Sequence, residues 1–326
     1  MVVGHHTNDY PYSSYLMNLT NLSSDQKKTL GSSILWNPKP TSEDDRLKFF
    51  NLDNVTFTGI CQPKHPMFTQ QLNLMPFVKV SLTFNRVVNP DFYFRWDPTG
   101  KPKGSYRLKI LSAVLFVRKV TVQDQYNQAV EKYLEAGNFV HMRMTEPRMT
   151  TRTYAGFGTQ IIEDNLLQGV LPKHITMGFV DNTAYTGATT LNPFAFQHFK
   201  KLKEVALYVN GAPFPYLPID VDFDSKNTAH AYFLLHAFGA HQTPDPPMIL
   251  KDEFDEGHTT LFAFNMAPDQ RDGEDTRMST GQPANVRAVF QFSSSDLTKS
   301  ITLLIRYEVD TEVLINRNRQ VLYHTQ

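Results

Sequence analysis

The sequence predicts an all-β protein of antiparallel sandwich type, and three observations support this prediction. Runs that alternate apolar and polar residues recur along the chain, and the run at 205–209 is one of the clearest. Asn210-Gly211 follows it, and this dipeptide favours a tight hairpin turn because both residues accept positive φ. Twenty prolines and sixteen glycines punctuate the chain, which suits many short strands better than long helices.

The first 135 residues open with a mixed region and then become β-like. Helical spacing of apolar residues predicts a helix from about Pro11 to Leu22, with Ser13 as its cap. The apolar run at 106–120 is long for one strand, so we expect a bend or bulge within it. Strands in this part are predicted at 55–59, 77–84, 92–96 and 106–120.

A single clear helix separates two sets of strands. It is predicted to begin near Thr121 or Asp124 and to end at Gly137, with Tyr126, Val130 and Leu134 on one face. The helix places a domain boundary at about residue 135. Further strands are predicted at 141–144, 150–154, 174–180, 204–209, 230–237, 259–264, 286–292, 301–309 and 313–315, with long loops at 181–193, 238–257 and 266–283.

Charge and cysteine content exclude several classes of protein. Thirty-two basic residues balance thirty-two acidic ones, so direct binding of nucleic acid is not expected. Cys61 is the single cysteine, which excludes an intrachain disulfide and favours folding in the cytoplasm or nucleus. A signal peptide is not expected, and no apolar run is long enough to span a bilayer.

No arrangement of residues predicts catalysis, a cofactor or a metal site. His236 and His241 are five residues apart, but the closely spaced His-x-His of metal-binding jelly rolls is absent. Glu253, Asp255 and Glu256 share an acidic loop, where carboxylates are usually solvated rather than paired across a cleft. We therefore predict that the chain is not an enzyme.

Two arginines near the C-terminus are candidates for contacts between subunits. Arg317 and Arg319 follow a predicted strand, and two arginines in a neutral chain make a weak site for a polyanion. Carboxylates of a neighbouring subunit are the partners that we favour for them, since guanidinium groups bind carboxylates in a fixed fork. The acidic loop provides Asp252, Glu253 and Asp255 as further candidates for such contacts.

Several segments together resemble the major capsid proteins of Polinton/Maverick elements and the related adintoviruses, which have the double jelly-roll fold. They run in family order from near the start of the chain to its end, so the resemblance covers nearly all of it. The matching segments are TNDYPYSSYL, HPMFTQQLNLMPFVKVSLTF, YRLKILSAVLFVRKV, LPKHITMGFVDNTAYTGATTLNPFAFQHFKKLKEVALYVNG, TTLFAFNMAPD and VLINRNRQVLY.

The resemblance implies a double jelly roll, in which two antiparallel eight-stranded sandwiches lie side by side with few short helices. Residues 1–135 would form the first roll and the connecting helix, and residues 136–326 the second. In the second roll, the strand at 204–209 would turn at Asn210-Gly211, with Val205, Leu207 and Val209 facing the core. Family members usually carry further strands upstream, so the first roll is expected to be truncated or to be completed by a neighbouring chain.

The resemblance also implies a function in assembly. Three copies would form a pseudo-hexameric homotrimer that tiles an icosahedral shell beside a penton or minor capsid protein, with the long loops as towers or trimer contacts. The expected location is the virion. Three alternatives stay open, of which the first is a single jelly-roll penton or minor capsid protein and the second a β-sandwich carbohydrate-binding module. The aromatic residues that could serve such a module are Tyr12, Tyr15, Trp36 and Tyr154. A metal-dependent enzyme of the cupin type is a third alternative.

Overall fold

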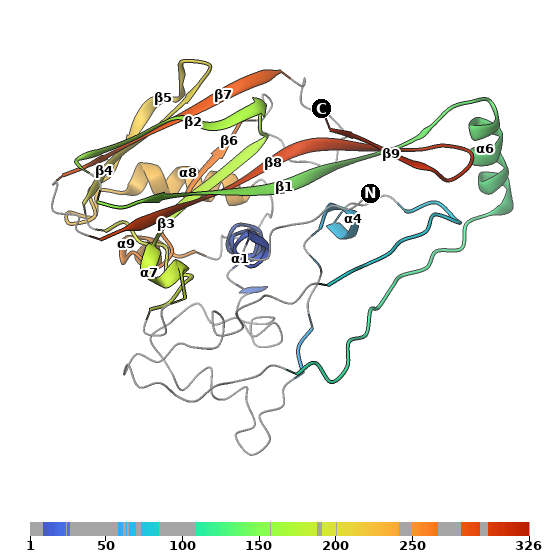
Figure 1. Cartoon of the computed structure of the whole chain (residues 1–326), viewed down its shortest axis with the longest axis horizontal. Helices are drawn as coiled ribbons and strands as arrows, with labels where there is room; N and C mark the ends of the chain where they lie inside the picture. The colour runs from blue at the N-terminus through green and yellow to red at the C-terminus, as the bar shows by residue number, and fades with distance from the viewer. Residues whose placement is uncertain are drawn as a thin grey trace.

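The computed structural model confirms the predicted fold class, because its described part consists mainly of antiparallel sheets with few short helices. Figure 1 shows two layers of strands, with α1 lying on the outer side of one layer. The structure describes residues 9–23, 25–26, 58–60, 63, 65–69, 73–84, 109–156, 158–187, 191–199, 201–240, 249–266, 282–293 and 299–325.

Two sheets contain all the strands of the described residues. The first has the order β1-β8-β3-β6, with β9 added beside β8, and the second has the order β2-β7-β4-β5. The strands are β1 (Val140–Tyr154), β2 (Gln160–Val170), β3 (His174–Asp181), β4 (Leu202–Val209), β5 (Ala212–Asp220), β6 (Phe262–Asn265), β7 (Pro283–Phe292), β8 (Ile301–Ile315) and β9 (Val321–Thr325). The helices are α1 (Asp9–Asn21), α4 (Pro66–Thr69), α6 (Asp124–Glu135), α7 (Asn182–Tyr185), α8 (Ala229–Ala240) and α9 (Lys251–Asp255).

The strand pairing is that of a jelly roll. The strands pair from the two ends of the series inward, as in one long hairpin that has been rolled up: β1 pairs with β8, β2 with β7, β3 with β6, and β4 with β5. The roll closes because β8 also pairs with β3 and β7 also pairs with β4, which gives two four-stranded sheets facing each other. β9 extends the first sheet beyond this set. The division of the whole chain at residue 135 stays a prediction.

The core lies between the two sheets. Phe179 of β3 points at the second sheet, where its ring lies edge-on to Phe290 with the centroids 4.9 Å apart. Val205 and Leu207 of β4 are buried on the same side, and Val209 packs against this core. Alternation therefore places His174, Thr176 and Gly178 on the opposite face of β3, which we call the outer face of the first sheet.

The outer face is covered as well, so β3 is buried along its whole length. A Cβ atom added at Gly178 would lie 2.5 Å from the Phe196 ring and 2.7 Å from Leu261, which shows how closely these residues approach the strand. Helix α1 lies over this face (Figure 1) and contributes Tyr12, Leu16 and Leu19 to the core.

One strand prediction was wrong. Residues 230–237 belong to helix α8, which packs against β6 and β5. A short apolar run does not distinguish a buried strand from a buried helix by periodicity. Ala231 and Leu235, four residues apart, are the buried positions, and this spacing is that of a helix.

Two further predicted strands are extended but unpaired. Residues 77–84 and the described part of 106–120 do not form strands in the structure, and most of their large apolar side chains are exposed. Residues 55–57, 92–96 and Cys61 lie outside the described residues, as does most of the loop 266–283. The first roll predicted for residues 1–135 therefore stays a prediction.

Most other elements are confirmed. The helix predicted at the centre of the chain is α6, and the predicted N-terminal helix is α1, which contains Ser13 rather than being capped by it. The strands predicted at 141–144 and 150–154 are one strand, β1, and those at 301–309 and 313–315 are likewise one strand, β8. The loop predicted at 181–193 contains α7, and the one at 238–257 contains α9. Strand β2 was not predicted, and its pairing is interrupted by a bulge between Glu163 and Leu167.

Candidate functional site

A line of three carboxylates crosses the outer face of the first sheet. Glu308, Asp310 and Glu312 occupy every second position of β8, so their side chains leave the strand on the same side. We call them the carboxylate ladder. Strand register brings their partners opposite: His174 of β3 faces Glu308, Thr145 of β1 faces Asp310, and Arg143 of β1 faces Glu312.

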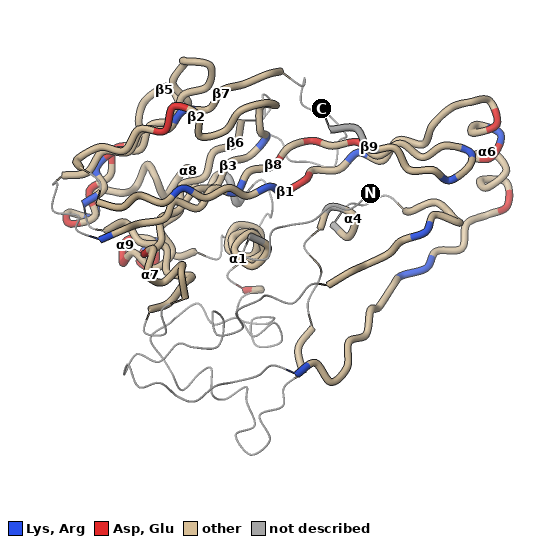
Figure 2. The backbone as a smooth tube through the Cα atoms, in the orientation of Figure 1, with Lys and Arg blue, Asp and Glu red and all other residues tan. Residues whose placement is uncertain are grey.

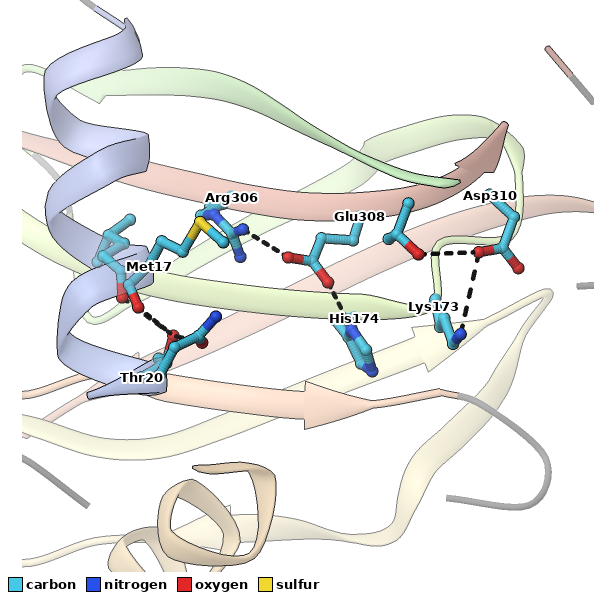
Figure 3. Close-up of polar contacts among 10 residues, drawn as sticks. Met17, Thr20, Lys173, His174, Arg306, Glu308 and Asp310 are labelled. Carbon is cyan, nitrogen blue, oxygen red and sulfur yellow. Dashed lines mark hydrogen bonds and ion pairs between the residues drawn. The ribbon is translucent and has the colours of Figure 1, made fainter. Parts of the chain in front are cut away.

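The inner end of the ladder is a buried ion cluster (Figure 3). Glu308 Oε2 lies 2.6 Å from Nδ1 of His174, and its Oε1 lies 2.5 Å from Nη2 of Arg306. The side chains of Arg306 and His174 are only 2% and 4% exposed. Burial alone would raise the pKa of Glu308, but the Arg306 guanidinium and His174 outweigh it and hold that pKa well below its usual range. Glu308 is therefore an ionised carboxylate inside the protein.

The partners of the ladder become more exposed toward its outer end, whereas the three carboxylate side chains are 12%, 9% and 14% exposed from Glu308 to Glu312. Asp310 Oδ1 accepts a 3.3 Å hydrogen bond from Thr145 and lies 3.9 Å from Lys173 Nζ. Glu312 Oε1 lies 2.9 Å from His141 Nδ1 and 3.3 Å from Arg143 Nε, and these two partners are about half exposed. Desolvation raises the pKa of Glu312, but the bonds to His141 and Arg143 outweigh it and lower that pKa. The ladder therefore stabilises β8 as it leaves the sandwich.

Helix α1 is attached beside the ladder by aromatic contacts. Tyr12 is fully buried, and its hydroxyl donates a 2.9 Å hydrogen bond to the carbonyl of Pro193. The ring of Tyr15 stacks on Phe194 with the centroids 4.5 Å apart. Figure 3 places Met17 of the same helix next to Arg306. Helix α1 and the buried ion cluster thus close the outer face together.

The tip of the β8–β9 hairpin holds the two arginines singled out in the sequence. Arg317 pairs with Glu135 of α6 at 3.3 Å, and Arg319 pairs with Glu131 of the same helix. Arg319 Nε also donates a 3.1 Å hydrogen bond to the carbonyl of Pro76. Within one chain these side chains therefore bind α6, and contacts of theirs with another subunit stay a prediction.

The acidic candidates Asp252, Glu253 and Asp255 lie on α9. Asp255 is buried, where its Oδ1 accepts a 2.5 Å hydrogen bond from Thr228 and its Oδ2 lies 2.5 Å from Lys251 Nζ. Glu253 accepts from the backbone N–H of Leu250 at the start of α9. Asp252 lies in the first turn, where a carboxylate is stabilised by the helix dipole. Asp255 thus has a structural task inside the chain, and contacts of these three residues between subunits stay a prediction.

Asn210 and Gly211 form the turn between β4 and β5. Their φ angles are 50° and 86°, as a tight hairpin turn requires. The Asn210 side chain accepts a 2.8 Å hydrogen bond from the backbone of Asn285, which attaches the turn to β7. The prolines that follow lie in β5, which is an edge strand of the second sheet in the described part of the chain.

The aromatic residues that a carbohydrate-binding module would use are occupied in packing. Tyr12 is buried, Tyr15 packs in the aromatic cluster, and the Tyr154 hydroxyl donates to Glu163, so these rings do not form an open platform for sugars. Trp36 and His241 lie outside the described residues. Within the described ranges no three histidine, cysteine or acidic side chains group as metal ligands, and none of the helices there is long and apolar enough to cross a membrane.

The carboxylate ladder was not predicted from the sequence, although a signal for it exists. The stretch Arg306-Tyr307-Glu308-Val309-Asp310-Thr311-Glu312 alternates acidic residues with others at the period of a strand. Such alternation usually marks a solvated face. The structure instead buries its inner end, because α1 and residues near Phe196 cover that side of the sheet.

The chain matches no known protein-family model and no curated protein. Several solved structures are similar to this chain. One is the structure of the Sputnik virophage, which matches at 11% sequence identity with a TM-score of 0.36, and the match covers 57% of this chain and 39% of that chain. The capsid of the virus PBCV-1 is similar at 9% identity and a TM-score of 0.34, over 60% and 54% of the two chains. The mavirus major capsid protein is similar at 12% identity and a TM-score of 0.32, over 59% and 43%. The match thus spans less than two thirds of the length of each of these proteins.

Proposed function

We propose that the chain is a structural subunit of a viral capsid, of the double jelly-roll major capsid class. The observation that carries the proposal is a jelly roll whose first sheet is covered on both faces. Its inner face packs on the second sheet, and its outer face packs under α1 and neighbouring segments. A jelly roll whose first sheet is packed on both faces can lie beside a second roll, as the double jelly-roll fold requires.

The resemblance of the sequence segments to known capsid proteins extends this proposal. We infer from it that the chain is related to the major capsid proteins of Polinton/Maverick elements and adintoviruses. Residues 1–135 would be the first roll, truncated or completed by a neighbouring chain, and residues 136–326 the second. Three copies would then provide six rolls, which gives a pseudo-hexagonal tile for an icosahedral shell in the virion. A penton or minor capsid protein would fill the fivefold positions. Folding would take place in the cytoplasm or nucleus of the host.

Heterologous contacts are needed for such a tile. In a cyclic trimer one surface of each subunit binds a different surface of its neighbour, and obligate contacts of this kind bury large apolar areas. The exposed apolar side chains at 77–84 and 110–120 supply such a surface. Without a second copy these apolar side chains would be exposed to water, and this exposure is unfavourable.

Sedimentation velocity and electron microscopy of the purified full chain test the proposal. We expect trimers at micromolar concentration, and hexagonal tiles or shells at higher concentration. A chain that stays monomeric at about 10 μM, where stable interfaces of standard size are occupied, contradicts the proposal. Rings with fivefold symmetry would instead support a penton protein.

A further inference from the structure

Two extended segments present the most apolar exposed surface of the described chain. They comprise residues 73–84 and 109–123, and we call them the arms. Leu115, Phe116 and Val117 are consecutive and all exposed, with Phe116 at 83%, so both sides of the extended backbone are open. Phe77 and Phe84 are similarly exposed on the other arm. Exposed apolar area of this kind marks an interaction surface.

The charge on the arms has one sign. Residues 73–84 and 109–123 contain Lys79, Lys109, Arg118 and Lys119 and no acidic residue. In Figure 2 these two segments accordingly carry blue patches and no red ones. A partner surface for the arms should therefore combine exposed apolar side chains with carboxylates.

The arms are held by one anchor, the tip of the β8–β9 hairpin. The arm of residues 109–123 runs directly into α6, which is attached to Arg317 and Arg319 by ion pairs. The other arm is attached through Pro76, whose carbonyl accepts from Arg319. In Figure 1 the two segments approach each other near α6 and then diverge. Fixing one end of each arm reduces the entropy lost when the arms bind a partner.

The edge strand β5 has the complementary character. Leu207 pairs with Phe214 and Val205 with Ile219, so the residues from Pro215 to Pro218 bulge outward opposite Ala206. The bulge presents Tyr216, at 86% exposure, and Leu217 to solvent. Prolines at both of its ends restrict the backbone, so the bulge is preorganised. Tyrosines in such positions often dominate binding energy.

Carboxylates follow this bulge in the chain. Asp220 and Asp224 are exposed, whereas Asp222 between them is paired with Lys203 at 2.9 Å. Residues 212–224 contain no basic residue. We call Tyr216, Leu217, Asp220 and Asp224 the β5 surface. Figure 1 places β5 at the end of the molecule opposite to α6, so the arms of one chain do not lie over its own β5 surface.

We infer that the arms of one copy bind the β5 surface of a second copy. The contact is heterologous, because it joins two different surfaces, and it repeats from copy to copy until a ring closes. Lys79, Lys109, Arg118 and Lys119 lie toward Asp220 and Asp224, and the apolar side chains of the arms cover Tyr216 and Leu217. This inference rests on the proposed self-assembly, for which it names the surfaces.

A charge-swap experiment tests the inference with the full chain. One variant carries Arg118→Glu and Lys119→Glu, a second carries Asp220→Lys and Asp224→Lys, and the dissociation constant of self-association is measured by sedimentation velocity. Each variant should bind itself about tenfold more weakly or worse, since like charges then face each other. In an equimolar mixture of the two variants both contacts between unlike chains are attractive, so association should be regained in part. A ring of three cannot alternate two variants, so one of its contacts stays repulsive.

Combining all four swaps in one chain should restore association, because every contact again joins opposite charges. Asp164→Lys is the matched control: Asp164 is 74% exposed on β2, at the other edge of the same sheet, and its replacement should leave association unchanged. Tyr216→Ala should weaken association about thirtyfold or more. Circular dichroism checks that each variant keeps its strands.

The outcomes separate the inference from the proposed function. If the parent chain does not self-associate, the proposed function fails and the inference fails with it. If the parent associates but the swaps act no differently from Asp164→Lys, or the fourfold variant is not rescued, the inference alone is overturned. Weakening by each swap together with rescue in the fourfold variant supports it.

Discussion

Replacing Glu308 with glutamine tests whether the buried end of the carboxylate ladder stabilises the outer face. The substitution keeps the size of the side chain and removes its negative charge. Arg306, at 2% exposure, then loses the carboxylate that neutralises it, and His174, at 4%, loses the carboxylate beside its Nδ1. Both side chains are thus withdrawn from bulk water.

The expected magnitude follows from this burial. Removing one partner of a buried ion pair costs about 3–5 kcal/mol, because the remaining charge is left uncompensated. One kcal/mol shifts the melting temperature of a domain of this size by about 2–4 °C. We therefore expect Glu308→Gln to lower the melting temperature by about 6–20 °C in differential scanning calorimetry.

Glu312→Gln is the matched control on the same strand and face. Its partners His141 and Arg143 are 50% and 44% exposed, so water replaces the lost carboxylate. Exposed pairs of this kind contribute at most about 1 kcal/mol. Equal losses in the two variants would refute the argument that the burial of its partners makes Glu308 important. In a double-mutant cycle, Arg306→Met should remove part of the penalty of Glu308→Gln, because the uncompensated charge then disappears.

The same cluster predicts a pH dependence. The pKa of Glu308 is held below its usual value of 4.5 in the folded chain, so its stabilising effect is fully present above that pH. The effect is lost as the pH falls through the lower pKa of the folded state. The difference in unfolding free energy between the parent and Glu308→Gln should hence shrink on acidification below about pH 5. A constant difference down to about pH 2 would contradict the assigned charge state.

Three further substitutions test the packing. Gly178→Ala should destabilise the chain by about 1–3 kcal/mol in urea unfolding, because the new methyl group would overlap the Phe196 ring, whereas Gly158→Ala, with open space around it, should have little effect. Tyr12→Phe should cost about 0.5–1.5 kcal/mol through the lost hydrogen bond to Pro193, and an unchanged urea midpoint would show that this bond does not stabilise α1. Gly211→Ala should cost about 1–2 kcal/mol because its φ is 86°, and a stabilised variant would contradict the turn geometry.

Alternation in the sequence identified the strand at 204–209, whereas a nearly uniform apolar run led to the wrong prediction at 230–237. The run at 204–209 has a clear alternation, because one face of β4 packs on the core and the other faces outward. Residues 230–237 are apolar almost throughout, and only the three-dimensional contacts of Ala231 and Leu235 show that they form a helix. The spacing of apolar residues does not distinguish a helix from a strand where nearly every position is apolar.

The candidate site was less predictable than the fold. Arg317 and Arg319 were recognised as a possible contact, but their partners Glu131 and Glu135 lie more than 180 residues away in the chain. The buried cluster at Glu308 depends on strand register and on the cover by α1, and neither follows from the local sequence. Long-range pairing of charges therefore had to come from the structure.

The long strand β8 connects the carboxylate ladder to the tip of the β8–β9 hairpin. Residues 301–308 of this strand lie between β1 and β3, whereas 311–315 lie between β1 and β9. At about 3.3 Å per residue, the part after Glu308 extends roughly 20 Å past the pairing with β3. The carboxylate ladder spans this transition, where the strand loses the neighbour that buries it. Its ion pairs hold β1 and β8 in register there, and the register sets where Arg319 meets Glu131 and Pro76. A shift in the register between β1 and β8 would hence displace the hairpin tip that anchors both arms.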